Sequence, residues 1–421
     1  MKIIKQRIEQ HLPRLPFGNK FIRKYLKLLN TRLLLFKERK IWFLPKKCDV
    51  LIFDSRGDSL MEVELAKVLS PYGTIGRLVF PGNGEINIPV LLASILKRGT
   101  RITAYCDSYI RRTNPRVVIS CIDNSTIFYS VAVRNPDVKS IFLQNGTRAY
   151  FSDVFEKLDR KPSGENMKVD FMLVFGSNIG AEYAKYVAGS VVPIGSFKNN
   201  NIPRVRPKVE GTLSFISQYR DVATRIERNG ILYTHQQWFE SLDQMIIPFL
   251  ASYAKDKGLQ FRIIPRAGHQ KDSSILRNEK RYFRGILGSE CEFSKWERHG
   301  SSYDDIDSTE VAVTIDSSLG LEAIARGTKS AIFSIRSTII GHSDPYYGPY
   351  KNYGWPGCYL DEGPFWTNNF STATFRRILD HLFTVSDEQW RAELEQHGFQ
   401  EVMQYDPGNS KLRAILANEL R

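Results

Sequence analysis

The sequence has no apolar run that approaches the roughly 20 residues of a membrane-spanning helix. Its densest apolar stretch, Leu33–Phe36, lies between Arg32 and Lys37. Residues 1–30 also lack the uninterrupted apolar segment of a signal peptide, so none is expected. The five cysteines are odd in number, and none are paired at metal-ligand spacing. This pattern favours reduced, cytosolic thiols over disulfides or a zinc site.

Several catalytic signatures are missing as well. The sequence has no GxxxxGK[ST] motif, which excludes a P-loop kinase or ATPase, and no GxSxG turn. No GxGxxG follows the first expected strand, which disfavours a nicotinamide or flavin enzyme. The nearest match to a metal-binding Asp-x-Asp loop, Asp304–Asp307, lies in a polar stretch before a strand and is typical of a turn.

Positive charge is abundant but unevenly placed. The 421 residues carry a net charge of +14, and residues 1–48 alone carry +12, so the rest is nearly neutral. From Lys20 this segment is amphipathic, with apolar residues at roughly helical spacing and basic residues between them. Such an arm can lie on an anionic membrane. It can also pack on the protein's own body. Nucleic acid is not expected as a partner, because the body has no basic groove with interleaved aromatic residues.

Strands and helices alternate after Cys48, which predicts βαβ units and parallel sheets. We expect an α/β protein with two tandem Rossmann-like, doubly wound domains and a cleft between them, preceded by the basic arm. A stretch rich in Asn and Pro, 197–211, is the expected linker. The expected organisation is an arm at 1–48, an N-terminal domain at 49–196, a C-terminal domain at 212–370 and terminal helices at 371–421.

Ligands of open parallel sheets bind outside the carboxyl ends of the strands. The expected strand that ends at Ile315 is followed by Asp316, Ser317 and Ser318, which open a helix. The unpaired N–H groups and the dipole of such a helix favour phosphate, and Glu322, one turn further, could accept hydrogen bonds from a sugar or ribose. The alternative is an ordinary helix cap with nothing bound.

Two further sets of residues follow expected strands. Arg266 comes after the strand 260–264, with His269 three residues on, and both could meet a phosphate. Each could equally be an ordinary surface residue. In the first half, Asp54, Asp58 and Asp123 could supply a general base that polarises an acceptor hydroxyl, with Asp123 ranked first. Aspartates also serve as caps and turn residues.

Three segments resemble a known family. They are Val117–Asn124 (VVISCIDN), Ser140–Arg148 (SIFLQNGTR) and Val313–Gly327 (VTIDSSLGLEAIARG). They resemble the surface carbohydrate biosynthesis family of bacterial GT-B glycosyltransferases and, more distantly, the capsule and lipopolysaccharide transferases that use CMP-activated Kdo or other nonulosonic acids. The CMP-sugar enzymes carry a His-Pro pair at the end of a C-terminal strand. Ile264–Pro265 stands at that place here.

The resemblance implies a donor nucleotide on the C-terminal domain and an acceptor, often lipid-linked, on the N-terminal domain. No metal is expected, because the sequence lacks an Asp-x-Asp loop for a metal–diphosphate, and the expected substrate is a nucleotide sugar with no further cofactor. The expected donor-binding residues are Ser217, Gln218, Arg266, His269, Asp316, Ser317, Ser318 and Glu322. The expected acceptor-binding residues are Asp54, Arg56, Asn124, Gln144 and Asn145. The expected catalytic carboxylate is Asp123 or Asp58.

The sequence therefore predicts a glycosyltransferase of capsule, O-antigen or lipopolysaccharide assembly. We expect it in the cytoplasm, held by residues 1–48 at the inner face of the bacterial cytoplasmic membrane. Three alternatives stay open on the same fold: a nucleotide-sugar 2-epimerase, a polyol-phosphate transferase, or a non-catalytic scaffold at the membrane.

Overall fold

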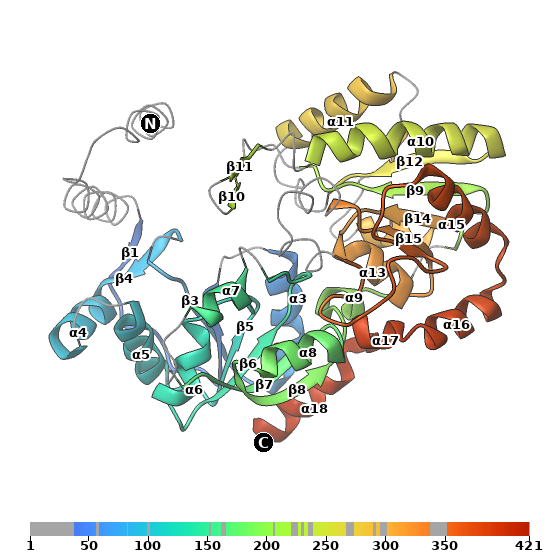
Figure 1. Cartoon of the computed structure of the whole chain (residues 1–421). Coiled ribbons are helices and arrows are strands. Elements are labelled where there is room, and N and C mark those ends of the chain that lie inside the picture. Colours follow the sequence, from blue (N-terminus) through green and yellow to red (C-terminus); the bar gives the residue numbers. More distant parts are fainter. Residues whose placement is uncertain are drawn as a thin grey trace.

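Two parallel sheets, one in each half of the chain, form the framework of the protein (Figure 1). The computed structural model describes residues 38–55, 59–81, 83–98, 102–150, 153–160, 166–204, 207–219, 226–228, 231–234, 239–266, 273–288, 292–294, 301–336 and 352–420. Within these ranges, no helix combines the length and the apolar content needed to cross a membrane.

The N-terminal sheet has six strands in the order β3-β2-β5-β6-β7-β8, and all neighbours run parallel. Every residue of β2 and β5 is buried, as in a parallel sheet covered on both faces. The strands are β2 (Val50–Phe53), β3 (Ile75–Leu78), β5 (Val117–Ser120), β6 (Lys139–Leu143), β7 (Lys168–Val174) and β8 (Ala188–Pro193).

Helices and one extra strand pair surround this sheet. The pair consists of β1 (Arg39–Ile41) and β4 (Glu85–Asn87), which run parallel to each other. The helical elements are α3 (Leu60–Leu69), η2 (Ser70–Tyr72), α4 (Ile88–Arg98), α5 (Ile102–Thr113), η3 (Phe128–Ser130), α6 (Val131–Arg134), α7 (Val154–Asp159), α8 (Ser177–Ala184) and α9 (Phe197–Asn201). Residues 102–105, although rich in the β-branched and aromatic residues typical of strands, form the start of α5.

The C-terminal sheet has the order β13-β12-β9-β14-β15-β16, again all parallel. Numbered within the sheet this is 3-2-1-4-5-6, the order of the Rossmann fold. The strands are β9 (Thr212–Ile216), β12 (Gln260–Ile264), β13 (Glu292–Phe293), β14 (Val311–Thr314), β15 (Lys329–Phe333) and β16 (Trp366–Thr367). The expected α/β fold with two Rossmann-like units in tandem, as in GT-B proteins, is confirmed.

The helices of this half are α10 (Ser241–Lys257), α11 (Ser273–Leu287), α12 (Ser301–Asp307) and α13 (Ser318–Ala325), and a small antiparallel pair joins β10 (Ile226–Arg228) to β11 (Ile231–Tyr233). The chain then ends in α15 (Thr372–Thr384), α16 (Asp387–Gln396), α17 (Phe399–Val402), η7 (Pro407–Asn409) and α18 (Ser410–Glu419). Helix α18 returns to the N-terminal sheet, where Leu412 and Leu416 share a core with Ile194 and Phe197.

The expected linker at 197–211 is only partly a linker. Its first five residues form α9, in which Phe197, Asn199 and Asn200 are buried. Arg326 of the C-terminal half donates to the carbonyl oxygens of Asn199 (3.2 Å) and Ile202 (2.8 Å). The Asn side chains bond here too, since Asn199 donates to the carbonyl oxygen of Glu322 at 3.3 Å and Asn200 to that of Ile194 at 2.8 Å, so this part of the segment is a hydrogen-bonded junction and not a loose connection. The bounds of the two domains themselves stay a prediction.

Candidate functional site

The loop between β14 and α13 is built as the sequence predicts. Ser317 caps α13, because its Oγ accepts from the backbone N–H of Leu319 at 3.3 Å. The backbone N–H of Ser317 donates in turn to Oγ1 of Thr314 at 3.1 Å. Gly320 is needed for packing: a Cβ there would lie 2.3 Å from Cγ2 of Thr314. The loop therefore holds Ser317 and Ser318 at the carboxyl edge of the sheet.

Arg336 joins three loops at this edge. Its Nε and Nη2 donate to the two carboxylate oxygens of Asp316, at 2.7 and 3.0 Å. The same Nη2 donates to Oε1 of Gln218 at 3.0 Å, and the guanidinium carbon lies 4.6 Å from the ring centre of Phe239. Arg336 is only 2% exposed. The loops after β9, β14 and β15 therefore meet around one buried cation.

A second contact group lies on the β12 side. Ser217 Oγ donates to Oε1 of the buried Glu279, and the backbone N–H of Arg266 donates to the same oxygen at 3.1 Å. The Arg266 side chain is exposed, and its Nη1 donates to the carbonyl oxygen of Tyr219 at 3.3 Å. Ser217, Gln218, Arg266 and Asp316 are thus brought together, either directly or through one shared partner.

The electrostatics of this edge include a buried acid. Asp243 of α10 accepts from the Tyr282 hydroxyl at 3.0 Å. Burial raises the pKa of Asp243 to about 7, although the Tyr282 hydrogen bond and the charge of Arg336 both act to lower it. The nearby negative charges of Asp316 and Glu240 add to the rise. Near neutral pH this carboxyl group therefore exists in both protonation states.

In the N-terminal half, Asp123 is fully buried. Arg148 donates to both of its carboxylate oxygens, at 2.7 and 2.6 Å, and the Tyr183 hydroxyl donates to Oδ2 at 2.7 Å. The backbone N–H of Asn145 completes the set at 3.2 Å. A carboxylate enclosed in this way has no open side for an acceptor hydroxyl. The role of general base expected for Asp123 does not fit this geometry, which is that of a structural ion pair.

Three predicted acceptor residues belong to the same network or border it. Asn145 donates to the carbonyl oxygen of Cys121 at 2.7 Å, and its side-chain oxygen accepts from Arg148. Gln144 is buried, accepts from the backbone of Phe175 at 2.8 Å and donates to the carbonyl of Gly146 at 2.9 Å. Asn124 donates to Asp153 at 3.4 Å. These contacts explain why the turns at 122–124 (IDN) and 144–146 (QNG) carry those residues.

Asp54 lies at the end of β2 with a φ of +53°, a left-handed conformation that non-glycine residues rarely adopt. Its Oδ1 accepts from Nδ2 of Asn83 at 2.9 Å, and the residue is 5% exposed. Arg56, Asp58 and His269 lie outside the described residues.

A family model described as "putative O-antigen biosynthesis protein" matches residues 141–420, more than half of the chain. The chain belongs to this family. The O-antigen family match runs from β6 to α18 and so contains the complete C-terminal sheet. A comparison with curated proteins gives no match.

Among solved structures, similar chains include the wall teichoic acid polymerase TagF in a CDPG soak, at 10% identity and a TM-score of 0.46 over 96% of this chain and 98% of that one. S. aureus MnaA in a co-structure with UDP has 11% identity and a TM-score of 0.45 over 88% and 95%. The UDP-GlcNAc 2-epimerase from Neisseria meningitidis bound to UDP-GlcNAc has 11% identity and a TM-score of 0.43 over 88% and 98%. These TM-scores lie below 0.5, so the assignment of the fold is based on the strand order of the two sheets and not on these similarities.

One predicted donor residue within the O-antigen family range lies elsewhere. Glu322 is 2% exposed, and its Oε2 accepts from the Tyr303 hydroxyl at 2.6 Å. Its carbonyl oxygen accepts from the Asn199 side chain at 3.3 Å, across the junction between the two halves. Glu322 is therefore a packing residue of that junction, and the contact with a sugar or ribose expected from the sequence does not fit its position.

Arg336 was missed by the sequence reasoning. The rule that selected the other loops, the carboxyl end of a parallel strand, applies to it too, since it follows the end of β15 by three residues. Within the described ranges, no three His, Cys, Asp or Glu side chains are grouped as metal ligands. Metal independence stays a prediction.

Proposed function

We propose that this O-antigen biosynthesis protein is a glycosyltransferase that moves a sugar from a nucleotide-sugar donor to a glycan or lipid-linked acceptor. The supporting observation is the cluster at the carboxyl edge of the C-terminal sheet. There the start of α13, the exposed Arg266 and the Arg336–Asp316 pair surround one edge of a Rossmann-like sheet. Rossmann-like sheets bind nucleotides at this position, with phosphate at a helix N-terminus.

The proposed donor chemistry is metal-independent stabilisation of the leaving phosphate. The Ser317 oxygen accepts from Leu319, which leaves its O–H able to donate to a phosphate oxygen. Ser318 supplies a second hydroxyl at the first position of the helix. Arg266, whose side chain is exposed at the same edge, adds a positive charge where negative charge develops. A CMP-activated nonulosonic acid or Kdo is the donor class of the more distant resemblance, but Ile264–Pro265 stands here in place of the His-Pro pair of those enzymes, so the donor base is left open.

The acceptor side of the proposal changes with the structure. Because Asp123 is enclosed by Arg148 and Tyr183, we assign the acceptor-polarising carboxylate to Asp58, which follows β2 by five residues. Asp123 keeps a positioning role, since its ion pair fixes the turns that carry Asn124 and Asn145. The acceptor would reach the loop after β2 at the inner face of the cytoplasmic membrane, where the basic residues of 1–48 bind anionic head groups.

A thermal-shift panel on the purified protein tests the donor site. CMP, CDP, UMP, UDP, GDP and dTDP are each added with magnesium and with EDTA. We expect at least one nucleotide to raise the melting temperature in EDTA, because a ligand that binds only the folded state stabilises it. Ser318→Ala and Arg266→Ala should reduce this shift. Arg281→Ala is the matched control, since Arg281 is exposed and contacts Asn278 on its own helix.

Two results would contradict the proposal. If no nucleotide stabilises the native chain, the scaffold alternative is favoured. If stabilisation appears only with magnesium, the metal-independent mechanism is wrong.

A further inference from the structure

A group of exposed apolar side chains gathers at one end of the N-terminal half. Eleven large apolar residues are exposed in the described part of the chain, and six of them lie on two neighbouring segments. Trp42 (67%), Phe43 (84%) and Leu44 (51%) follow β1, while Leu92 (55%), Ile95 (43%) and Leu96 (85%) lie on α4. We call these six residues the apolar face. Soluble surfaces rarely leave so many adjacent apolar groups uncovered.

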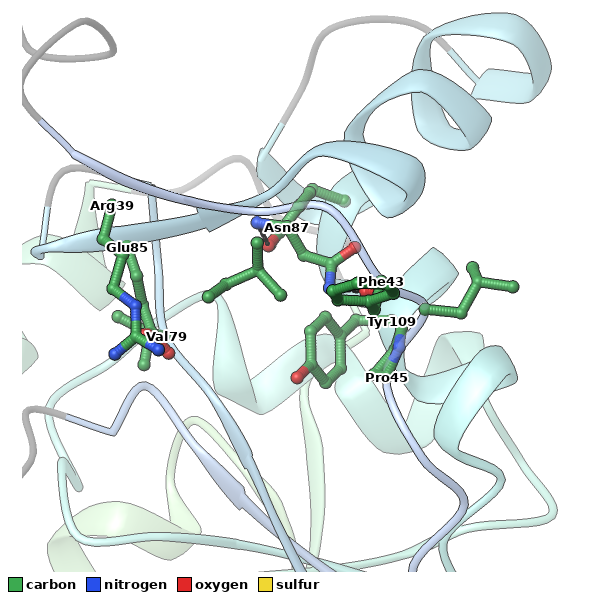
Figure 2. Close-up of a pocket in the computed structure, with 10 residues that line it drawn as sticks. Arg39, Phe43, Pro45, Val79, Glu85, Asn87 and Tyr109 are labelled. Carbon is green, nitrogen blue, oxygen red and sulfur yellow. Dashed lines mark hydrogen bonds between the residues drawn. The ribbon is translucent and has the colours of Figure 1, made fainter.

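The two segments are fixed to each other by Asn87, the last residue of β4 (Figure 2). Its Nδ2 donates to the carbonyl oxygen of Phe43 at 2.9 Å, and its Oδ1 accepts from the backbone N–H of Val90 at 3.1 Å. Its backbone N–H donates to the Tyr105 hydroxyl at 3.1 Å. One buried side chain thus holds the loop 42–44 to the first turn of α4, so the apolar face is presented as a unit.

Helix α4 is apolar on both of its sides. Val90 and Ser94, one turn apart, are buried, and Val90 shares a small core with Tyr105 of α5. The exposed residues of α4 lie on the opposite side, and its sequence, IPVLLASILKR, contains no acidic residue. A helix that is hydrophobic all round is normally covered on every side. We therefore expect an apolar partner to contact the outer side of α4.

A cavity of about 280 Å³ lies next to this face. Phe43, Leu44 and Pro45 form part of its wall, together with Tyr105 and Tyr109 (Figure 2). Phe43 and Leu44 therefore border this cavity as well as the solvent.

The charges around the apolar face point to anionic lipid. Arg39, Lys46 and Lys47 are exposed on either side of Trp42–Leu44, and the single acidic residue of 38–48, Glu38, is buried. In the sequence, the basic residues of 1–37 directly precede β1, which ends at Ile41 next to the same loop. Apolar residues flanked by Lys and Arg suit a membrane interface, where the rings and aliphatic chains enter the acyl boundary and the cations meet head groups.

We propose that the apolar face inserts into the interfacial layer of an anionic membrane, so that β1, β4 and α4 form a folded docking surface in addition to the basic residues of 1–37. This deepens the membrane association put forward under the proposed function and rests on it.

Vesicle co-sedimentation of the full chain tests the proposal. Phosphatidylcholine vesicles are compared with vesicles that also contain phosphatidylglycerol. We expect the native chain to bind the anionic vesicles, and Phe43→Ser/Leu96→Ser to weaken this binding roughly tenfold, because two exposed apolar side chains no longer enter the lipid. Leu360→Ser is the matched control, since Leu360 is 79% exposed away from the apolar face. It should bind as the native chain does.

A second measurement places the loop in the bilayer. Lipids brominated in the acyl chains should quench part of the tryptophan fluorescence, and Trp42→Phe should remove that part. Native binding by Phe43→Ser/Leu96→Ser, or equal quenching with and without Trp42, would overturn the proposal and leave residues 1–37 as the anchor. A drop in the unfolding midpoint of this variant with unchanged vesicle binding would show that the protein itself covers the face, and would also overturn it.

The nucleotide panel on the same variant separates the two proposals. A native thermal shift in a chain that has lost vesicle binding supports the docking surface. The absence of any nucleotide shift in the native chain contradicts the glycosyltransferase, whereas the vesicle results are still decisive for the apolar face.

Discussion

Arg336 donates to both carboxylate oxygens of Asp316, although the two residues belong to different loops, after β15 and after β14. Arg336 is almost fully buried, and Asp316 keeps about a fifth of its side chain exposed. The pair therefore lies where the protein interior meets the surface of the candidate donor site. Its consequences can be measured separately for stability and for ligand binding.

Loss of Arg336 should destabilise the protein. Arg336→Ala removes two hydrogen bonds to the partly buried Asp316 and the contact with Phe239. We expect the free energy of unfolding to fall by about 3 kcal/mol, the cost of breaking a buried ion pair from one side. Urea unfolding measures this, with Arg281→Ala as the exposed control. An unchanged midpoint would mean that the pair contributes nothing to folding.

Asp123→Asn separates a structural role from a catalytic one. The amide keeps the shape of the carboxylate but removes the charge that Arg148, only 8% exposed, contacts at 2.6 Å, and leaves it with Asp153 at 3.4 Å as its remaining counter-charge. We expect a loss of about 3 kcal/mol or more in unfolding free energy. Asp137→Asn, on an exposed residue, is the control. A variant of native stability that has lost all transfer activity would instead restore Asp123 as the general base.

Tyr303→Phe removes one buried hydrogen bond at the junction and leaves Glu322 without the hydroxyl it accepts from. The expected cost is about 1–3 kcal/mol of unfolding free energy, with no change in the nucleotide-induced thermal shift. Tyr405→Phe, on an exposed ring, serves as the control. A weaker nucleotide shift in Tyr303→Phe at native stability would return Glu322 to the donor site.

Asp243 makes stability depend on pH. Its pKa is raised from 3.8 to about 7 by burial, so between these values the folded protein keeps a proton that the unfolded chain releases. The stability due to this proton is present below about pH 4 and is lost as the pH rises towards 7. Paired urea titrations measure the unfolding free energy of Asp243→Asn minus that of the native protein. This difference should be larger at pH 8 than at pH 5. Equal differences at both pH values would contradict the raised pKa.

Sequence reasoning succeeded where one local pattern decides the outcome. The buried strands β2, β5 and β14 are short apolar runs followed by turn residues, and the strand-end rule selected loops that the structure joins at Gln218, Arg266 and Asp316. It failed where partners are distant. No residue near Asp123 in the sequence indicates its hydrogen bond with Tyr183, 60 residues away. Likewise, no residue near Glu322 indicates its hydrogen bond with Tyr303. A carboxylate after a strand has the same local sequence whether it meets a substrate or a buried cation.

Helix α18 has a consequence for how the protein is made. Its Leu412 and Leu416 complete the core under Ile194 and Phe197, and the backbone oxygen of Leu420 accepts from Arg116 at 2.6 Å. The N-terminal half therefore lacks part of its interior until α18 (Ser410–Glu419) has left the ribosome. Domains generally fold in the order of synthesis. Here the first half emerges first but is completed only after the second half has been made, so a nascent chain stalled before residue 410 would present an open hydrophobic surface to chaperones.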